Sequence, residues 1–198
     1  MNTEQAPASF RDLAEAGGGG LAPAYALVAF WRDAGADAWF AKNAAFDDEF
    51  RERFLALHFA AARRECENWL GDPCANLALV LLLDQFPRNT FRGTAHMYAT
   101  DPLARFYTRH LIDTGGVASI EDALKLFVCV PFIHSESLDD QRFGLELYRR
   151  YAPANMQYAL EHYEIIRRFG RFPHRNAALG RTTTADEQAF LDQGGFSG

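Results

Sequence analysis

The hydrophobic residues of this chain recur at spacings of three and four positions, and no stretch alternates hydrophobic and polar residues over the length of a strand. A spacing of three to four places side chains on one face of an α-helix, whereas alternation is typical of a half-buried strand. Phe46, Phe50, Phe54 and Leu57 show the helical spacing clearly. The pattern predicts an all-α protein built from successive antiparallel helix pairs.

Glycine, proline and capping residues mark where the predicted helices begin and end. Ser119, with Asp122 three residues later, resembles a capping box, and Pro131 is expected to kink the helix that contains it. Residues 1–20 are polar, rich in alanine and end in four glycines, so we expect a flexible tail followed by a single domain over residues 21–198. The predicted helices span residues 25–35, 43–70, 73–85, 101–115, 119–132, 138–151, 153–169 and 184–191.

The most hydrophobic stretch, residues 77–83, ends abruptly in polar side chains. It is too short to cross a bilayer, which needs about 20 apolar residues, so it predicts a buried helix. Pro87 should stop this helix at about Gln85, which leaves Asp84 in the last turn, where the helix dipole disfavours a carboxylate. We therefore expect Asp84 to form an ion pair. Its candidate partners are Arg88, Arg92 and Arg175.

Two loops have similar sequences. Residues 86–89 read Phe-Pro-Arg-Asn and residues 172–176 read Phe-Pro-His-Arg-Asn, and both sit at the end of a predicted helix. One explanation is a diverged internal duplication; the other is two helix stops, in which Phe-Pro breaks the helix and Arg-Asn caps the exposed carbonyls. No other stretch repeats, so we favour two helix stops. A separate hypothesis is that both loops converge on one cavity.

Several hydrophobic helices end in polar or charged side chains, which are costly to bury unless they are paired. Arginine forks bind carboxylates and phosphates, and histidine changes protonation near neutral pH, so such a set is typical of an active site or an anion pocket. The same set is typical of a structural ion-pair network. The candidate binding residues are Asp84, Arg88, Asn89, Arg92, His134, Glu136, His174, Arg175 and Asn176.

These candidates support three functions. The protein binds a small anionic metabolite or a peptide carboxylate, or it is a hydrolase or lyase, or it is an interaction scaffold whose polar network is purely structural. For an enzyme, the candidate acid–base residues are His134 and His174, oriented by Asp84 or Glu136. The sequence has no HExxH motif and no close histidine pair, so we predict no metal site, and the identity of any cofactor stays open.

Composition and charge exclude some classes of partner. The 198 residues suffice for one domain with a sizeable core, and 17 Phe residues predict that this core is aromatic, with Trp39, Phe40 and His58 in or beside it. The net charge of −6 argues against nucleic-acid binding. Three cysteines without CxxC spacing, and no basic segment followed by a hydrophobic one, predict a reduced cytoplasmic protein with no membrane partner. The oligomeric state is not determined by the sequence.

Short stretches spread over residues 25–198 have the order and spacing of one known family. They are Phe30-Trp31, Trp39-Phe40, LLDQFPRN at 82–89, RGTA at 92–95, Pro131-Phe132 with HSE at 134–136, GRFPHRN at 170–176, LGR at 179–181 and GGFS at 194–197. On these residues the chain resembles the bacterial family called domain of unknown function 924.

The resemblance implies an all-helical, right-handed superhelical fold similar to tetratricopeptide (TPR) repeat proteins, although the 34-residue repeat signature is absent. It implies no activity. Arg32, where the family usually has Phe, and Gly198, where the family usually ends in Phe, depart from the family pattern.

Overall fold

The computed structural model describes residues 20–196, and every regular element in that range is helical. The all-α fold class is therefore confirmed. The α-helices are α2 (Ala22–Ala34), α3 (Ala36–Trp39), α4 (Ala44–Ala62), α5 (Pro73–Val80), α6 (Phe86–Thr90), α7 (Asp101–Asp113), α8 (Leu126–Ile133), α9 (Leu138–Tyr151), α10 (Met156–Phe169) and α11 (Ala185–Asp192). Short 3₁₀-helices are Glu67–Gly71, Ala95–Tyr98, Gly116–Ser119, Asp122–Leu124, Pro153–Asn155 and Pro173–Arg175.

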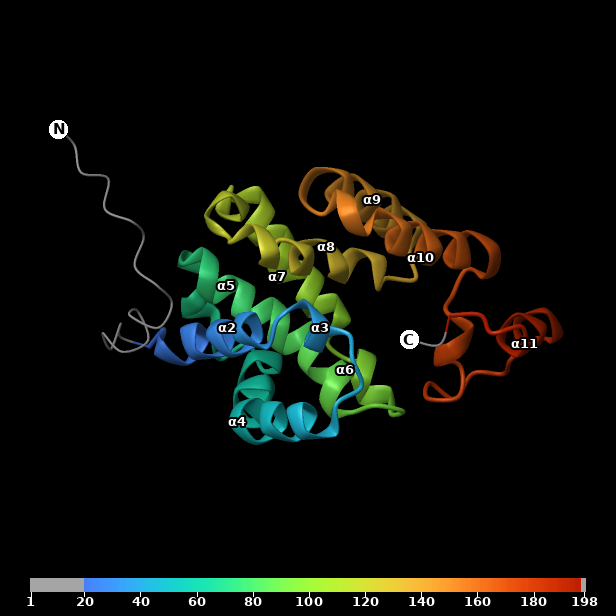
Figure 1. Ribbon diagram of the computed structural model, residues 1–198, viewed down its shortest axis with the longest axis horizontal. Helices are drawn as coiled ribbons and strands as arrows, with labels where there is room; N and C mark the ends of the chain where they lie inside the picture. The colour runs from blue at the N-terminus through green and yellow to red at the C-terminus, as the bar shows by residue number, and fades with distance from the viewer. Residues whose placement is uncertain (1–19, 197–198) are drawn as a thin grey trace.

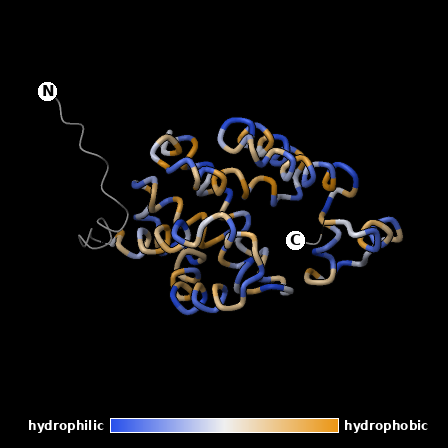
Figure 2. Tube along the Cα trace, in the orientation of Figure 1, coloured by the Kyte–Doolittle hydropathy of each residue, from blue (hydrophilic) through white to orange (hydrophobic). Residues whose placement is uncertain are grey.

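The helices pack around two large hydrophobic clusters. The first joins α2, α4, α5 and α7, and the second joins α8, α9 and α10. Helix α8 contacts both α7 and α9, so it links the two clusters, and Figure 1 shows it between these helices. Hydrophobic segments gather along the interior of this arrangement, while the outer sides of α9 and α10 are largely hydrophilic (Figure 2). A smaller third cluster attaches the C-terminal segment to α10.

The core is rich in aromatic rings, as predicted. Trp31 and Trp39 stack with ring centroids 6.4 Å apart, and Phe127 packs edge-on against both. The interpretation of His58 as a core histidine is confirmed, since its side chain is fully buried. The prediction for Phe40 is wrong, because its side chain is 56% exposed.

Three predicted boundaries agree with the structure. Helix α9 covers the predicted residues, and the side chain of Ser137 caps its first turn. Helix α10 ends at Gly170, whose φ of 70° is the left-handed conformation that glycine adopts without strain. Thr184 and Glu187 form a capping box at the start of α11.

Helix α4 ends earlier than predicted. It stops at Ala62 because Arg64 adopts a left-handed conformation, with φ of 64°. The Glu65 amide then bonds back to Ala60 O over 2.9 Å, which closes the helix end. The chain turns here because Trp69 packs at the start of α2, where its Nε1 donates to Gly20 O over 3.0 Å.

The prediction that Pro87 stops the hydrophobic helix at Gln85 is wrong. The helix continues from α5 through a π-helical turn, Leu81–Gln85, into α6. In this turn the Phe86 amide bonds to Leu81 O instead of Leu82 O, and Pro87 has no amide hydrogen to give to Leu83 O.

Two distant side chains satisfy the two carbonyls that the π turn releases. His58 Nδ1 donates to Leu82 O over 2.8 Å, and Thr100 Oγ1 donates to Leu83 O over 2.6 Å. The proline is thus tolerated because tertiary donors replace the missing helical bonds.

The predicted capping box at Ser119 and Asp122 is also wrong. The chain passes through two 3₁₀ turns there, and α8 begins only at Leu126, without a side-chain cap. Ile120 lies between the two turns in extended conformation and is buried, which separates them. Pro131 lies inside α8 as predicted, and the predicted kink stays a prediction.

The predicted flexible tail over residues 1–20 lies outside the described residues, apart from Gly20, and so does the family departure at Gly198. The single-domain boundary and the TPR-like superhelix stay predictions. Over residues 20–196, no helix has the length and hydrophobicity needed to cross a membrane.

Candidate functional site

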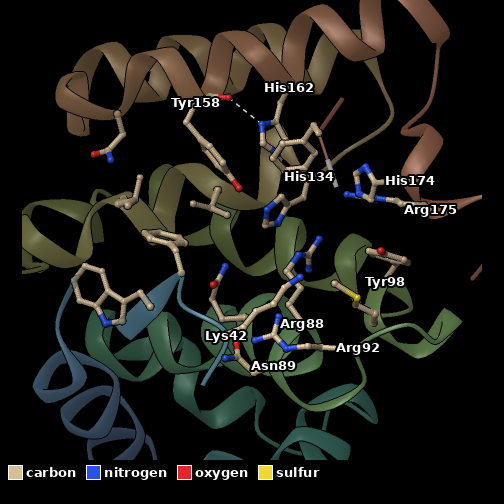
Figure 3. Close-up of a pocket in the computed structure, with 18 of the residues that line it drawn as sticks. Lys42, Arg88, Asn89, Arg92, Tyr98, His134, Tyr158, His162, His174 and Arg175 are labelled. Atoms are coloured by element: carbon tan, nitrogen blue, oxygen red, sulfur yellow. Dashed lines mark hydrogen bonds between the residues drawn. The ribbon is translucent and has the colours of Figure 1, made fainter. Parts of the chain in front are cut away.

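A cavity of about 430 Å³ lies where α3, α6 and α8 face α10 and the C-terminal segment. Part of its wall is hydrophobic, with Trp39, Leu126 and Val130. Figure 3 shows Lys42, Arg88 and Arg92 on one side of the cavity. Tyr158 and His162 lie on the opposite side, with His134 between the two groups. Segments from both hydrophobic clusters therefore build a single pocket.

Asp84 lies beneath the cavity wall and is 1% exposed. His134 Nδ1 donates to Asp84 Oδ1 over 2.8 Å, and Gln85 Nε2 donates to Oδ2 over 2.5 Å. Arg88 Nη1 lies 3.3 Å from Oδ1, which confirms one of the predicted ion pairs. Burial alone would raise the pKa of Asp84, but the charge of Arg88 and the bonds from His134 and Gln85 outweigh it and lower that pKa. Asp84 is therefore an anion at neutral pH.

The two arginine loops meet at Asp101, which confirms the hypothesis of convergence. Arg88 binds Asp101 through two nitrogens, at 2.8 and 3.0 Å, and Arg175 Nη1 lies 3.6 Å from Asp101 Oδ2. The guanidinium carbons of Arg88 and Arg175 lie 5.9 and 4.5 Å from the ring centre of Tyr98. The guanidinium carbon of Arg175 also lies 4.3 Å from the ring centre of Phe172.

Arg88 and Arg175 are not equally well paired. The carboxylates of Asp101 and Asp84 outweigh the burial of Arg88 and raise its pKa. Burial, together with the charge of Arg88, lowers the pKa of Arg175 to about 10, so Arg175 remains a cation at neutral pH. Its Nε is buried and has no hydrogen-bond partner among the described residues.

Further basic groups line the α6 side of the cavity. Arg92 Nη2 lies 3.2 Å from Asp47 Oδ2, and Asn89 Nδ2 donates to Asp47 Oδ1 over 2.7 Å. Lys42 is exposed and has no carboxylate partner within residues 20–196. Four cations thus line the cavity, and three carboxylates pair with them, which leaves one net positive charge. The four cations are Lys42, Arg88, Arg92 and Arg175, and the three carboxylates are Asp47, Asp84 and Asp101.

Three histidines on the cavity wall are neutral at pH 7. Burial, together with nearby basic groups, lowers the pKa of His162 to about 3 and that of His174 to about 4. Burial and the charge of Arg88 also lower the pKa of His134, although Asp84 opposes this shift. His162 Nδ1 donates to Tyr158 O over 2.9 Å, while His174 Nδ1 is buried and unpaired within the described part of the chain.

Six of the nine predicted binding residues line this cavity. They are Arg88, Asn89, Arg92, His134, His174 and Arg175. Asp84 lies behind His134. Glu136 does not reach the wall, because Arg181 binds it through two bonds of 2.8 Å and the Phe172 amide donates to it over 2.9 Å. Asn176 points to the C-terminal segment, where its Nδ2 donates to Glu187 Oε2 over 3.2 Å.

Sequence reasoning missed Lys42, Tyr98, Tyr158 and His162, which also line the cavity. Tyr158 and His162 are four residues apart, so they share one face of α10, and this spacing was the available signal. Burial raises the pKa of Tyr158 to about 12, so its hydroxyl stays protonated. Lys42 and Tyr98 lie in short connections, where no periodic pattern marks them.

The arrangement offers anion binding and proton transfer. Arginine and lysine side chains donate hydrogen bonds to an anion. Asp84 holds Nδ1 of His134, so the other ring nitrogen, Nε2, is available for proton transfer in the cavity. Over residues 20–196, no group of three or more His, Cys, Asp or Glu side chains is arranged to hold a metal ion.

Comparison with known proteins gives a family without an assigned activity. The profile described as "Bacterial protein of unknown function (DUF924)" matches residues 27–195. A solved structure, described as a protein of unknown function, ATU0120, from Agrobacterium tumefaciens, is 49% identical and superposes with a TM-score of 0.83, covering 86% of this chain and 97% of that one. No protein with a curated description matches the chain. The chain therefore belongs to the DUF924 family of bacterial proteins.

Proposed function

We propose that this protein binds a small organic anion in the cavity between α6 and α10. The observation that carries the proposal is a buried arginine on the cavity wall, Arg175, that is incompletely paired. Buried cations are costly unless an anion is close, and the carboxylate nearest to Arg175, that of Asp101, is already bound by Arg88 through two bonds. A carboxylate ligand supplies a closer partner.

Arg175 is the cation that most needs a ligand. Its nearest carboxylate oxygen is 3.6 Å away, and its Nε lacks a partner. A planar guanidinium binds a carboxylate through two parallel hydrogen bonds, and such charge-assisted bonds are stronger than neutral ones. The stacked rings of Tyr98 and Phe172 hold this guanidinium in place.

The hydrophobic part of the wall favours a ligand with an apolar body. Trp39, Leu126 and Val130 offer it contact away from the arginines. Mostly apolar pockets of this size with a few polar groups are typical of small-molecule sites. A small metabolite fits the proposal best, and the terminal carboxylate of a peptide presents the same chemistry. The cytoplasmic location expected from the sequence belongs to this proposal and is supported by three buried free cysteines.

Calorimetric titration with aliphatic and aromatic monocarboxylates tests the proposal. Arg175→Met should weaken binding about tenfold or more, because a hydrogen bond to a charged group contributes about 1.5–3 kcal/mol. Lys42→Met, at an exposed position, should weaken it less and keep the fold intact. Arg142→Met, on the exposed side of α9, is the control. Equal affinities for all four proteins contradict the proposal.

A second candidate function, acid–base catalysis on the bound anion, is favoured by the bond between Asp84 and His134. A carboxylate that holds one imidazole nitrogen orients the other as a base. Of the two predicted acid–base histidines, only His134 has such a partner. A hydrolase or lyase activity should then be lost in His134→Asn and retained in His174→Asn. Equal loss in both variants contradicts this role.

The third predicted function, a scaffold with a purely structural network, has less support. It expects the polar groups to be sealed or dispersed, whereas six of the nine candidates line one cavity.

A further inference from the structure

We propose that the anion bound in this cavity carries a hydroxyl group that donates a hydrogen bond to His134 Nε2, so that the ligand class is a hydroxy-carboxylate with an apolar body. The inference rests on the proposed function, because it identifies the ligand of the same cavity. It follows from the hydrogen-bond partners of two histidine rings.

The proton positions on these rings are determined by their partners. His134 Nδ1 lies 2.8 Å from a carboxylate oxygen of Asp84, and His162 Nδ1 lies 2.9 Å from the carbonyl oxygen of Tyr158. Both partners only accept hydrogen bonds, so each Nδ1 must carry the proton. In a neutral imidazole the other nitrogen then has a lone pair and only accepts.

Both Nε2 atoms are free to accept from a ligand. Both rings line the cavity, and neither Nε2 has a hydrogen-bond partner in the part of the chain that the structure describes. His134 is the more open of the two, because aromatic rings of Tyr158, Phe172 and Phe196 pack around His162. The basic side chains satisfy acceptors on a ligand, whereas His134 can be satisfied only by a donor.

A hydroxyl group suits this position better than an ammonium group. Arg88 and Arg175 disfavour another positive charge near His134 and His162. One net positive charge on the cavity wall also matches a ligand whose net charge is −1. A zwitterion has no net charge and would leave that positive charge uncompensated. A neutral donor next to a carboxylate is a hydroxy acid.

The first test is the protonation state of the rings. Nitrogen-15 NMR of the histidines at pH 7 should find His134 and His162 neutral, with the proton on Nδ1. A proton on Nε2 of His134 overturns the proposal, since that nitrogen would then be a donor.

The second test compares matched probes, 3-phenyllactate against 3-phenylpropionate, and lactate against propionate, by calorimetry. The members of each pair differ by one hydroxyl, and we expect the hydroxy acid to bind about tenfold more tightly. His134→Asn keeps a donor to Asp84, because the Asn amide lies where Nδ1 lay, but it leaves no acceptor at the position of Nε2. The ratio of the affinities for the hydroxy acid and the deoxy acid should fall to about one in this variant.

His110→Gln, on α7 and outside the cavity wall, is the control and should keep the preference. Equal binding of the two members of each pair contradicts the hydroxyl but leaves the anion pocket standing. Absence of binding by every probe contradicts the anion pocket itself.

Discussion

Asp84 shows how a single buried carboxylate organises the site. Its two oxygens accept from His134 and Gln85, and Arg88 lies next to one of them. Asp84 therefore fixes the orientation of one cavity residue, His134, and the position of another, Arg88. It does so from behind the wall, without contact with the cavity.

Asp84→Asn should destabilise the fold by about 3–5 kcal/mol at pH 7, because it removes one partner of a buried ionic network. The pKa of Asp84 is lowered in the folded protein, so its contribution is present above the unfolded pKa of about 3.9 and is lost as the pH falls through the folded value. Urea denaturation of both proteins between pH 7 and pH 3 should show that the difference in their free energies of unfolding decreases at the acidic end.

Asp48→Asn, at an exposed position near the start of α4, is the control and should change stability by less than about 0.5 kcal/mol. If the difference in free energy of unfolding between the wild-type protein and Asp84→Asn grows as the pH falls, the pKa of Asp84 is raised in the folded protein. That result would contradict the ion pair.

The site residues that can be predicted from the sequence are the polar ones that interrupt or directly follow a hydrophobic stretch. Asp84, Arg88 and His134 stand out for this reason. Tyr158 and His162 do not, because they lie within an ordinary amphipathic helix and become cavity residues only through packing. Glu136 has the same local pattern as His134, but its partner Arg181 comes from a distant segment that the sequence does not place.

At the scale of elements, the π turn depends on two side chains far away in the sequence. Thr100→Val should lower the free energy of unfolding by about 1–3 kcal/mol, because it leaves the buried carbonyl of Leu83 without a donor. Urea denaturation measures this loss. Valine has nearly the shape of threonine, so packing changes little.

Thr108→Val is the matched control. Thr108 is fully buried and its hydroxyl also donates to a carbonyl, Ala104 O, four residues earlier in α7. That carbonyl keeps its helical amide partner, so this variant should be close to neutral. Equal losses of unfolding free energy in the two variants would contradict the conclusion that Leu83 O depends on the hydroxyl of Thr100.

The helix boundaries that the sequence predicts correctly are those with local signals. Ser137, Gly170 and Thr184 each act through a neighbouring residue. The π turn is not predicted, because its stability comes from His58 and Thr100, and the rule that proline ends a helix holds only when no such donors are present.

At the scale of the whole molecule, buried histidines should set the pH dependence of stability. The pKa values of His58, His134, His162 and His174 are all lowered by burial, so the unfolded chain binds protons that the folded one does not. Stability is then greatest above about pH 6.5 and decreases as the pH falls below it.

His162→Asn should reduce this dependence. Each such histidine contributes a slope of up to about 1.4 kcal/mol per pH unit, and the asparagine amide still bonds to Tyr158 O. Urea denaturation at several pH values between 7.5 and 5 should give a shallower slope for the variant. Tyr163→Phe, on the same helix, controls for ring packing, and an unchanged slope in His162→Asn contradicts the prediction.

The fold class follows from the hydrophobic spacing, and the meeting of the two arginine loops follows from their sequences. The cavity itself does not, because its walls come from both hydrophobic clusters, and the sequence does not place α6 opposite α10. Local patterns thus predict the elements, and the long-range ion pairs and hydrogen bonds determine the site.

The π turn has a consequence for insertions and deletions. A π turn holds one more residue than an α turn over the same rise, so a deletion of one codon within 81–85 would restore a regular α-helix. Because the wide turn takes up the extra residue, Arg88 and Asn89 would keep nearly the same direction toward the cavity. A regular helix that contains a proline leaves one carbonyl without an amide donor, whereas this π turn leaves two. Among relatives, a gap at this point would mark proteins that keep the pocket and need one distant donor fewer.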